Sequence, residues 1–435
     1  MTDFKQLYES KRMTAKQIAE QVQDGWIMCI DAAVSHPTAI LSAISERAKN
    51  GGVKDLKIQT MFDVYPLEFY TDPTLADKIT GYSWFSGGFA RKAVNSGYAD
   101  FIPSYYRDIP GSILREYDYD AVLVEVSPMD KHGYFSCSTI NSFSEAMLEK
   151  TKRIYLQVND QQPRAVCGKQ IHISQVTALV EENHPLMVSA PPVLDDVSMT
   201  IGALIAERIP DGACIQLGIG AIPDATGMML KTKHDLGIHT EMFTDSMVEL
   251  IECGAVNNSK KQIHRYQSVT TFAYGSQRIY DYIDDNPAML IMPVNYVNDP
   301  NVICKNDNVI SINAALEVDL MGQVCAESVG TKHMSGSGGQ IDFVRGACQS
   351  KGGKSFIAFA STAKGGTISK IKSILTPGAV CTTSKNDVDY IVTEYGVAHM
   401  RGRSLGERAK QLIAIAHPDF RDELTFEAKK RGILI

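Results

Sequence analysis

One carboxylate and two glycine-rich segments have the residue types that could do covalent chemistry. Glu241 lies in residues 237–245, between a glycine-rich segment at 216–223 and a second one at 334–343. A glutamate can act as a covalent nucleophile when it is held against an electrophilic carbonyl group. Glycine lets the backbone approach a ligand closely, so N–H groups of both segments could stabilise a developing oxyanion. Taken alone, Glu241 would be interpreted as a surface carboxylate; its setting predicts a nucleophile.

The first glycine-rich segment follows a strand-like run and contains Gly218, Gly220 and Ala221. It lacks the third glycine of a dinucleotide-binding fingerprint, and no phosphate-loop lysine motif is present. Neither an NAD site nor a nucleoside-triphosphate loop is therefore indicated. We expect a turn whose backbone amides face a ligand at a helix N-terminus.

The second glycine-rich segment contains Gly336, Gly338 and Gly339, which disfavour both helix and strand. A flexible surface hairpin is one interpretation. Against it, an apolar segment at 340–344 follows at once and reads as a strand or a helix. A loop that is anchored to a core element is more often a binding loop.

The elements that must position these residues alternate along the chain. Short apolar runs typical of buried strands occur at 121–126, 154–158, 289–292, 309–312 and 390–393, and 142–152 reads as a helix. Strands alternating with helical stretches predict an α/β fold with mostly parallel sheets. Near the end of the chain, Ser404 and Glu407 have the spacing of a capping box that begins a helix.

A degenerate internal repeat relates the two halves of the chain. Residues 19–30 read as a helix end, an Asp-Gly turn and a buried strand, and residues 206–217 repeat this layout 187 residues later. A small-residue loop and a proline, Pro37 or Pro223, follow each copy. Chance similarity between two strand–loop–helix units is the alternative interpretation.

A chain of 435 residues is too long for one ordinary core, so two domains are expected. The paired prolines at 191–192 suit a linker, because proline stops helices. We therefore predict an N-terminal domain at 1–190 and a C-terminal domain, carrying Glu241, at 191–435.

The composition excludes several classes of function. The formal net charge of −7 and the scattered basic residues give no support to nucleic-acid binding. The nine cysteines include no C-x-x-C pair, so neither a metal site nor a disulfide framework is predicted. The N-terminus has no signal-peptide pattern, and no apolar stretch is long enough to cross a bilayer, so we expect a cytoplasmic protein without membrane association.

Together these motifs resemble the acetyl-CoA hydrolase/transferase group of family I CoA-transferases, and within it the 4-hydroxybutyrate and butyrate CoA-transferases. The similarity runs essentially from end to end. The passages that carry it are residues 217–224, 237–242, 335–343, 393–398 and 415–421.

The resemblance implies two similar CoA-transferase-like α/β domains and a homodimer or homotetramer. It implies that Glu241 is the catalytic glutamate and that the loop 336–339 supplies oxyanion and CoA contacts. The stretch 218–221 matches the glycine loop that faces the thioester in the family. Glu394 and Asn313 match positions around the reacting carbonyl and CoA in related transferases.

The implied reaction moves CoA between a short-chain acyl-CoA and a free carboxylate, such as 4-hydroxybutyrate or butyrate with acetyl-CoA. Coenzyme A is then a substrate, and no tightly bound cofactor is expected. Ping-pong kinetics through a glutamyl-CoA thioester follow from this chemistry. An acyl-CoA hydrolase that uses the same glutamate, and a catalytically idle CoA-binding protein, are alternatives.

Two further residues are candidates for the substrate pocket. Arg91 could meet the second carboxylate of a dicarboxylate acceptor such as succinate or itaconate, or could simply be a surface arginine at a helix start. His36 lies in 30–37, a stretch that departs from the 4-hydroxybutyrate transferase pattern, as 81–92 does. The resemblance therefore leaves the acceptor acid open.

Overall fold

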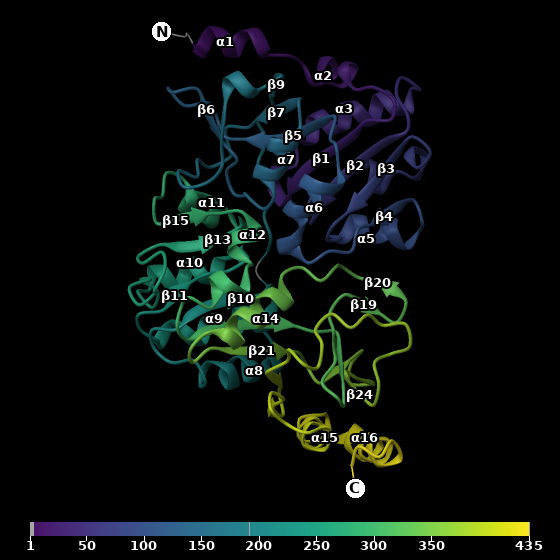
Figure 1. The fold of residues 1–435 in the computed structure, drawn as a ribbon, viewed down its shortest axis with the longest axis vertical. Helices are drawn as coiled ribbons and strands as arrows, with labels where there is room; N and C mark the ends of the chain where they lie inside the picture. The colour runs from purple at the N-terminus through teal and green to yellow at the C-terminus, as the bar shows by residue number, and fades with distance from the viewer. Residues whose placement is uncertain (1–3, 191, 435) are drawn as a thin grey trace. The chain divides into compact units, whose positions relative to one another are not determined.

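The computed structural model describes residues 4–190 and 192–434 (Figure 1). The chain forms two compact units. Unit 1 comprises Met1–Ala190 and Val269–Val297, and unit 2 comprises Pro191–Ser268 and Asn298–Ile435. One boundary of the units thus falls between residues 190 and 191. The segment Val269–Val297, which the sequence-based division places in the C-terminal domain, packs with unit 1 instead.

Unit 1 is built, within its described residues, on a seven-stranded sheet whose neighbouring strands all run parallel. In spatial order its strands are β4 (Ala99–Phe101), β3 (Ile79–Ser83), β2 (Leu56–Met61), β1 (Ile27–Ala32), β5 (Ala121–Val126), β7 (Ile154–Val158) and β9 (Ala178–Glu181). Every residue of β5 and β7 is buried, as expected for strands covered on both faces.

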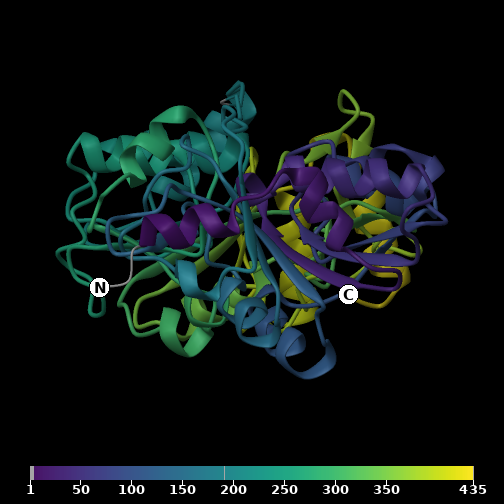
Figure 2. The same ribbon diagram turned by 90° about the horizontal axis from the view of Figure 1, so that it is seen from above.

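Helices and short strands complete unit 1 (Figures 1 and 2). The helices are α1 (Phe4–Lys11), α2 (Ala15–Gln21), α3 (Thr38–Lys49), α4 (Glu68–Thr71), α5 (Gly88–Asn95), α6 (Ile109–Glu116), α7 (Ser144–Lys150), α11 (Gln277–Ile283) and α12 (Val294–Val297). The short strands are β6 (Tyr134–Ser136), β8 (Gln170–His172), β13 (Ser268–Thr270), β14 (Phe272–Ala273) and β15 (Met289–Ile291). Figure 2 shows the purple helices at the start of the chain on the side of unit 1 that faces the viewer.

Unit 2 contains, among its described residues, a six-stranded sheet that is parallel except at one edge, where β25 and β26 pair in antiparallel fashion. In spatial order its strands are β11 (Gly237–Ile238), β10 (Cys214–Leu217), β16 (Val309–Ala314), β21 (Lys354–Ala358), β25 (Tyr390–Thr393) and β26 (Gly396–His399). The predicted α/β fold with mostly parallel sheets is confirmed.

The helices of unit 2 cover this sheet and extend to the C-terminus. They are α8 (Asp196–Ala206), α9 (Ala221–Met229), α10 (Asp245–Glu252), α13 (Pro300–Ile303), α14 (Gln340–Gln349), α15 (Leu405–Ala414) and α16 (Pro418–Lys430). The short strands are β12 (Met242–Phe243), β17 (Glu317–Asp319), β18 (Val324–Cys325), β19 (Ser328–Val329), β20 (Lys332–His333), β22 (Thr362–Ala363), β23 (Ile368–Ser369) and β24 (Ile371–Lys372). The predicted capping box is present, since Ser404 and Glu407 each hydrogen-bond the other's backbone N–H at the start of α15.

The repeat is visible in the positions of equivalent strands. β1 begins at Ile27 and β10 begins at Cys214, which is the spacing that the sequence repeat predicts. Each strand is preceded by a helix, followed by a loop and a helix, and flanked by parallel strands on both sides. The two units are therefore similar α/β domains, as expected.

Candidate active site

Glu241 lies in unit 2, in the short turn between β11 and β12. The strand β11 pairs in parallel with β10, and α10 begins four residues after Glu241. The turn therefore leaves the carboxyl edge of a parallel sheet, which is where α/β proteins place their ligands.

The carboxylate of Glu241 accepts hydrogen bonds from two donors in unit 2. Asn298 Nδ2 donates to Oε2 over 2.7 Å, and the backbone N–H of Gly339 is the second donor. Gly339 is the residue from which α14 begins, so the carboxylate lies at a helix N-terminus, where negative charge is favoured.

Only glycine fits at position 339. A Cβ atom there would lie 1.9 Å from Glu241 Oε2 and 2.1 Å from Asn298 Nδ2, far inside van der Waals contact. The missing side chain is what lets the carboxylate reach the backbone amide. The predicted second glycine-rich loop is thus in direct contact with Glu241.

Burial raises the pKa of Glu241 to about 7, although the hydrogen bonds from Asn298 and Gly339 act in the opposite direction. Desolvation disfavours the charged carboxylate more than two donors stabilise it. Near neutral pH the group is therefore partly ionised, and its ionised form is more basic than an ordinary glutamate. A perturbed carboxyl of this kind is typical of a functional site.

The other residues of the second loop lead the chain into α14. Gly338 has a φ of 53°, in the left-handed region that favours glycine, and Ser335 Oγ donates to the Gly336 carbonyl over 3.1 Å. The apolar segment that follows is helical, since α14 spans Gln340–Gln349. Gln340 anchors the helix start by donating to the Ala314 carbonyl at the end of β16 over 2.8 Å.

The first glycine loop turns from β10 into α9. The Gly218 N–H donates to the Ile312 carbonyl over 2.9 Å, which continues the β10–β16 ladder by one residue. Gly220 then adopts a φ of 113° and immediately precedes Ala221, the first residue of α9. The loop is therefore a strand-to-helix turn, and its backbone geometry matches the expected helix N-terminus.

Asn313 belongs to a small amide network at the end of β16. Its Nδ2 donates to Ser311 Oγ over 2.9 Å and to Gln216 Oε1 over 3.3 Å. Ser311 Oγ also donates to Gln216 Oε1, over 2.8 Å. The network ties the strand β16 to the end of β10, directly before the turn at Gly218.

Glu394 follows β25 and is bound by Ser361, whose N–H and Oγ donate to its two carboxylate oxygens over 2.9 and 2.5 Å. Lys370 contributes charge to the same cluster: burial lowers its pKa to about 8, while the Glu394 carboxylate acts against that shift. The Lys370 ammonium also lies 5.1 Å from the centroid of the Phe359 ring. Glu394 is thus an anchored carboxylate with a nearby cation.

The two remaining candidates belong to unit 1. His36 is fully buried, its Nε2 lies 3.0 Å from the Asp31 carbonyl, and burial lowers its pKa to about 4. The ring is therefore neutral and holds the loop after β1. Arg91 lies in α5, whose first turn is capped by Asp63, and its buried Nε has no hydrogen-bond partner among the described residues.

Asn298 is the site residue that sequence reasoning missed. It is fully buried, and its contact with Glu241 joins residues 57 positions apart. The local sequence Asn298-Asp299-Pro300 predicts only a helix start, and Asp299 does cap α13 by accepting the Asn301 N–H. No local pattern marks the residue before that cap.

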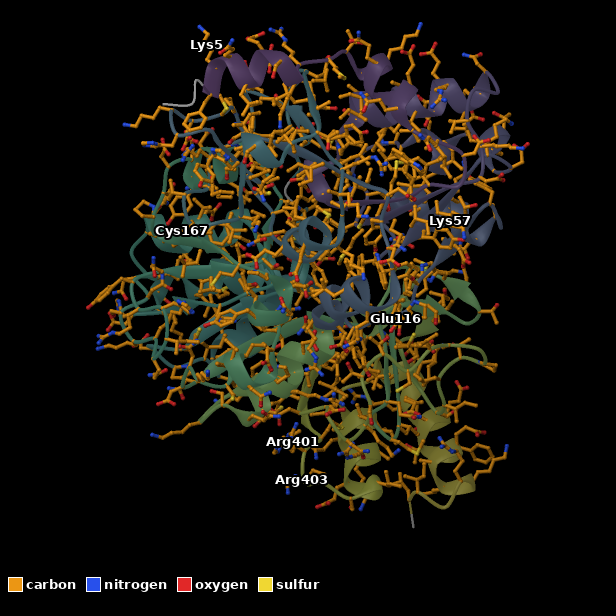
Figure 3. The ribbon with its side chains drawn as sticks, turned by 45° about the horizontal axis from the view of Figure 1, so that its top comes forward. Lys5, Lys57, Glu116, Cys167, Arg401 and Arg403 are labelled. Carbon is orange, nitrogen blue, oxygen red and sulfur yellow. The ribbon has the colours of Figure 1, made fainter. Side chains whose placement is uncertain are left out.

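Figure 3 shows Lys5 and Lys57 projecting from unit 1 and Arg401 and Arg403 projecting from unit 2. Across residues 4–190 and 192–434, no group of three or more His, Cys, Asp or Glu side chains could hold a metal ion. The same residues contain no helix with the length and apolar character that spanning a membrane demands.

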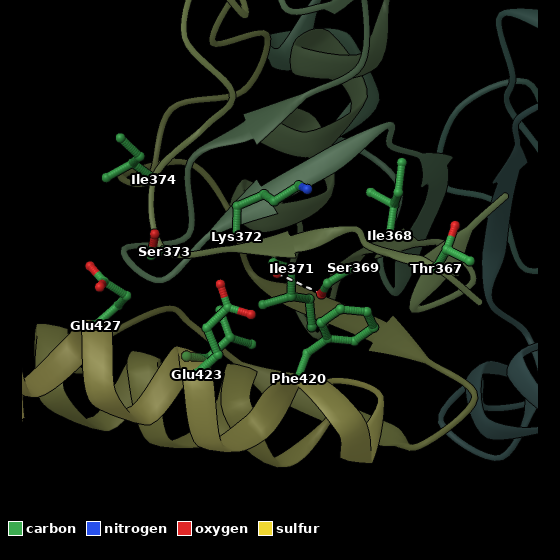
Figure 4. Close-up of a pocket in the computed structure, with 11 residues that line it drawn as sticks. Thr367, Ile368, Ser369, Ile371, Lys372, Ser373, Ile374, Phe420, Glu423 and Glu427 are labelled. Carbon is green, nitrogen blue, oxygen red and sulfur yellow. Dashed lines mark hydrogen bonds between the residues drawn. The ribbon is translucent and has the colours of Figure 1, made fainter.

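A cavity of about 400 Å³ opens elsewhere in unit 2, between α16 and the strands β23 and β24. Figure 4 shows Phe420 and Glu423 of the helix pointing toward Ile371 of the strand. Its lining consists of residues 367–369 and 371–374 and of side chains of α16, so the sequence-predicted site residues are not part of it.

Comparison with known proteins matches both parts of the chain to one family. The model of the acetyl-CoA hydrolase/transferase N-terminal domain matches residues 1–190, and that of the C-terminal domain matches residues 275–428. Among curated proteins, the chain is 45% identical to succinyl-CoA:cyclohexane-1-carboxylate CoA transferase of Geobacter metallireducens, covering 98% of this chain and 97% of the relative. It is 43% identical to 4-hydroxybutyrate coenzyme A transferase of Clostridium kluyveri, covering 99% and 100%.

Solved structures agree with these relatives. The crystal structure of RipA from Yersinia pestis superposes with a TM-score of 0.94 at 38% identity, covering the whole of both chains. The resemblance to the CoA-transferases is thereby confirmed over the full length. The chain belongs to the acetyl-CoA hydrolase/transferase family and is a CoA-transferase.

Proposed function

We propose that Glu241 is the covalent nucleophile and that CoA passes through a glutamyl-CoA thioester on its side chain. The observation that carries this proposal is the setting of the carboxylate at the N-terminus of α14, between Asn298 Nδ2 and the Gly339 N–H. Its pKa of about 7 makes the ionised form a better nucleophile than an ordinary glutamate.

The first half-reaction has two steps. A carboxylate oxygen of Glu241 attacks the thioester carbonyl carbon of the acyl-CoA, the C–S bond breaks, and an acyl-glutamyl anhydride and CoA thiolate result. The thiolate then attacks the glutamyl carbonyl, which releases the free acid and leaves the glutamyl-CoA thioester. A second carboxylate runs the same steps in reverse, so no net proton is consumed and the thioester energy is kept.

Each tetrahedral intermediate carries an oxyanion that needs preorganised donors. The Gly339 N–H and Asn298 Nδ2 already point at the Glu241 carboxyl, so they support its oxygen when that carboxyl is itself attacked. We assign stabilisation of the acyl oxyanion to backbone N–H groups of the two glycine loops, at Gly220 and Ala221 and at Gly336 and Gly338. The Gly218 N–H is bound to the Ile312 carbonyl, so Gly218 serves the first loop as an anchor and is not a donor. In this scheme Asn313 supports the first loop.

For the substrates, we propose acetyl-CoA and a short-chain acid such as 4-hydroxybutyrate or butyrate. Support comes from the relative named 4-hydroxybutyrate coenzyme A transferase, which matches over essentially the full length. Coenzyme A then acts as a substrate and no tightly bound cofactor is needed. A dicarboxylate such as succinate or itaconate is the competing acceptor, with Arg91 as the candidate partner of its second carboxylate.

The covalent intermediate can be trapped directly. The enzyme is incubated with acetyl-CoA alone, treated with borohydride and analysed by peptide mass spectrometry, because borohydride reduces a glutamyl thioester and spares a free carboxylate. We expect reduction at Glu241, no reduction in Glu241→Gln, and nearly abolished transfer in Glu241→Asp, where one methylene misplaces the nucleophile. Full transfer activity in either variant contradicts the proposal.

Transfer and hydrolysis are separated by the acceptor. Consumption of butyryl-CoA, formation of acetyl-CoA and release of free CoA are measured with and without acetate, and the same assay is repeated with succinate and itaconate as acceptors. A transferase shows acceptor-dependent turnover, whereas a hydrolase releases CoA at the same rate without any acid. Turnover with dicarboxylates that is lost in Arg91→Met would establish the competing specificity.

The expected homodimer or homotetramer and the cytoplasmic location stay predictions. Light scattering of the purified enzyme measures the first, and cell fractionation tests the second.

A further inference from the structure

The strand that leads to Glu241 is unusually short and lies at the edge of its sheet. β11 comprises Gly237–Ile238 and pairs on one side with β10. On that side the N–H groups of Gly237 and His239 donate to the carbonyls of Ala213 and Ile215. The N–H and C=O of Ile238 therefore point away from β10, toward the side where a further strand would pair.

On this outer side the backbone of Val256 forms an isolated bridge with Leu236, and beyond it two side chains take the place of a further strand at Ile238. Asn258 Oδ1 accepts the Ile238 N–H over 2.8 Å, and Lys261 Nζ donates to the Ile238 carbonyl over 2.8 Å. Both residues come from the loop that follows α10. Glu241 thus lies three residues after Ile238, whose backbone N–H and C=O are both hydrogen-bonded by side chains.

Lys261 also hydrogen-bonds the backbone of its own loop, which packs against β11. Its Nζ donates to the Gln267 carbonyl over 2.6 Å, while Asn258 Nδ2 donates to Ser268 Oγ over 3.1 Å. A Cβ at Gly237 would lie 2.6 Å from Lys261 Cγ, so the aliphatic stem packs directly on the strand backbone. Glycine at position 237 is what admits the lysine.

Burying the amine of Lys261 costs desolvation free energy that its contacts must offset. The residue is only 3% exposed, and burial lowers its pKa to about 8, while Cys214 acts slightly in the other direction. His264, on the same loop, has its pKa lowered by burial and by the charge of Lys261. An apolar side chain would fill the space without desolvating an amine, so the two carbonyl contacts explain the lysine.

We propose that Lys261 is a positioning residue for the catalytic glutamate: its amine holds β11 in register and thereby sets the place of the Glu241 carboxylate against Asn298 and Gly339. The inference rests on the proposed role of Glu241. It assigns to Lys261 no contact with the substrate and no proton transfer.

The test is the variant Lys261→Met, which keeps most of the stem and removes the donor. A nucleophile displaced by about 1 Å loses on the order of 10²-fold in rate, so kcat should fall by about that factor. The KM for acetyl-CoA should stay within about twofold, because the binding surface is unchanged. Lys261→Arg retains a cationic donor on a long stem and should recover at least about tenfold of the lost kcat.

Lys11 of unit 1 is the matched control. Its amine also bridges backbone carbonyls, those of Ile173 and Val176, and burial lowers its pKa as well. Lys11→Met should lower the melting temperature and leave kcat unchanged, whereas Lys261→Met should lower both. A folded Lys261→Met with wild-type kcat overturns the inference, and so does an equal loss of kcat in Lys11→Met.

The failure of this inference is distinct from failure of the proposed function. If Glu241→Gln is inactive and folded Lys261→Met is fully active, only the role of Lys261 is wrong. If Glu241→Gln keeps its activity, the nucleophile itself is wrong. If Lys261→Met does not fold, the kcat of Asn258→Leu, which removes the other contact to Ile238, decides: wild-type kcat in that variant overturns the inference.

Discussion

Glu125 in unit 1 and Glu241 in unit 2 are both carboxylates of the parallel-sheet regions, but they are bound in opposite ways. Glu125 is completely buried, one residue before the end of β5, and each of its oxygens accepts two side-chain hydrogen bonds. The donors are Asn159 Nδ2 and Gln162 Nε2 on Oε1, and Gln157 Nε2 and His184 Nε2 on Oε2, over 2.7 to 3.0 Å. Glu241 is half-buried, and the donors identified on it are Asn298 and Gly339.

The comparison relates the hydrogen bonding of each carboxylate to the role that it would have: structural for Glu125 and, as proposed above, catalytic for Glu241. Four side-chain donors occupy the two oxygens of Glu125, so these oxygens are unavailable to a substrate. Two donors orient Glu241 and leave burial dominant, which is why its pKa is raised to about 7. The predictions below test this contrast.

The largest expected effect is the loss of transfer in Glu241→Gln. Removing a covalent nucleophile should lower kcat by about 10⁴-fold or more. The same substitution at Glu125 should leave the kcat of the folded enzyme within about threefold. Steady-state assays of both variants with butyryl-CoA and acetate measure this, and comparable losses at the two sites would break the contrast.

Next in size is the stability cost at the other carboxylate. Glu125→Leu leaves four donors without their acceptor, and three of them, Gln157, Asn159 and Gln162, are buried. The free energy of unfolding should therefore fall by about 3 kcal/mol or more. Urea denaturation followed by circular dichroism gives the value. Glu241→Gln is the control and should not destabilise the protein comparably.

The donors on Glu241 should matter for rate more than for folding. Asn298→Leu removes the side-chain donor to Oε2 and should lower kcat by about 10²-fold, the typical loss for one oxyanion-type hydrogen bond. It should also raise the pKa of Glu241 further, since that bond favours the charged form. An unchanged pH–rate profile in a variant with reduced kcat would assign Asn298 a different role.

The smallest predicted effect is on pH dependence. Because the nucleophile must be ionised, kcat/KM for acyl-CoA should fall about tenfold per pH unit below pH 7. A carboxyl whose folded-state pKa is raised binds its proton more tightly in the folded protein, so its contribution to stability decreases as pH rises from about 4.5 to 7. Glu241→Gln should therefore be more stable than wild type at pH 8, by roughly 1–3 kcal/mol, with a smaller difference at pH 5. Thermal melts at the two pH values check the sign.

Much of the fold could be predicted because it follows from local patterns. The expected strands at 121–126, 154–158 and 390–393 are β5, β7 and β25, and the helix expected at 142–152 is α7, Ser144–Lys150. The repeat predicted that β10 begins 187 residues after β1, at Cys214 and Ile27 respectively. The excursion of Val269–Val297 into unit 1 was not predicted, since domain membership depends on tertiary contacts that no local pattern encodes.

The residues of the candidate site likewise fall into those that the sequence could identify and those that it could not. Glu241 and Gly339 have recognisable sequence contexts, and the structure brings them into contact. Asn298 and Lys261 do not, because each acts on a backbone or side-chain group that is distant in sequence or lies beyond a turn. Asparagines and lysines in polar loops are common, and only the folded chain distinguishes these two.

The membership of Val269–Val297 in unit 1 has a consequence for the synthesis of the enzyme. The chain leaves unit 2 after Glu241, contributes to unit 1, and returns to unit 2 at Asn298. During synthesis, residues 1–190 are therefore made before the segment that completes unit 1, and Glu241 is made before its hydrogen-bond donor Asn298. A chain divided at position 190 would separate unit 1 from the segment Val269–Val297, so unit 1 needs both parts of the chain to be complete.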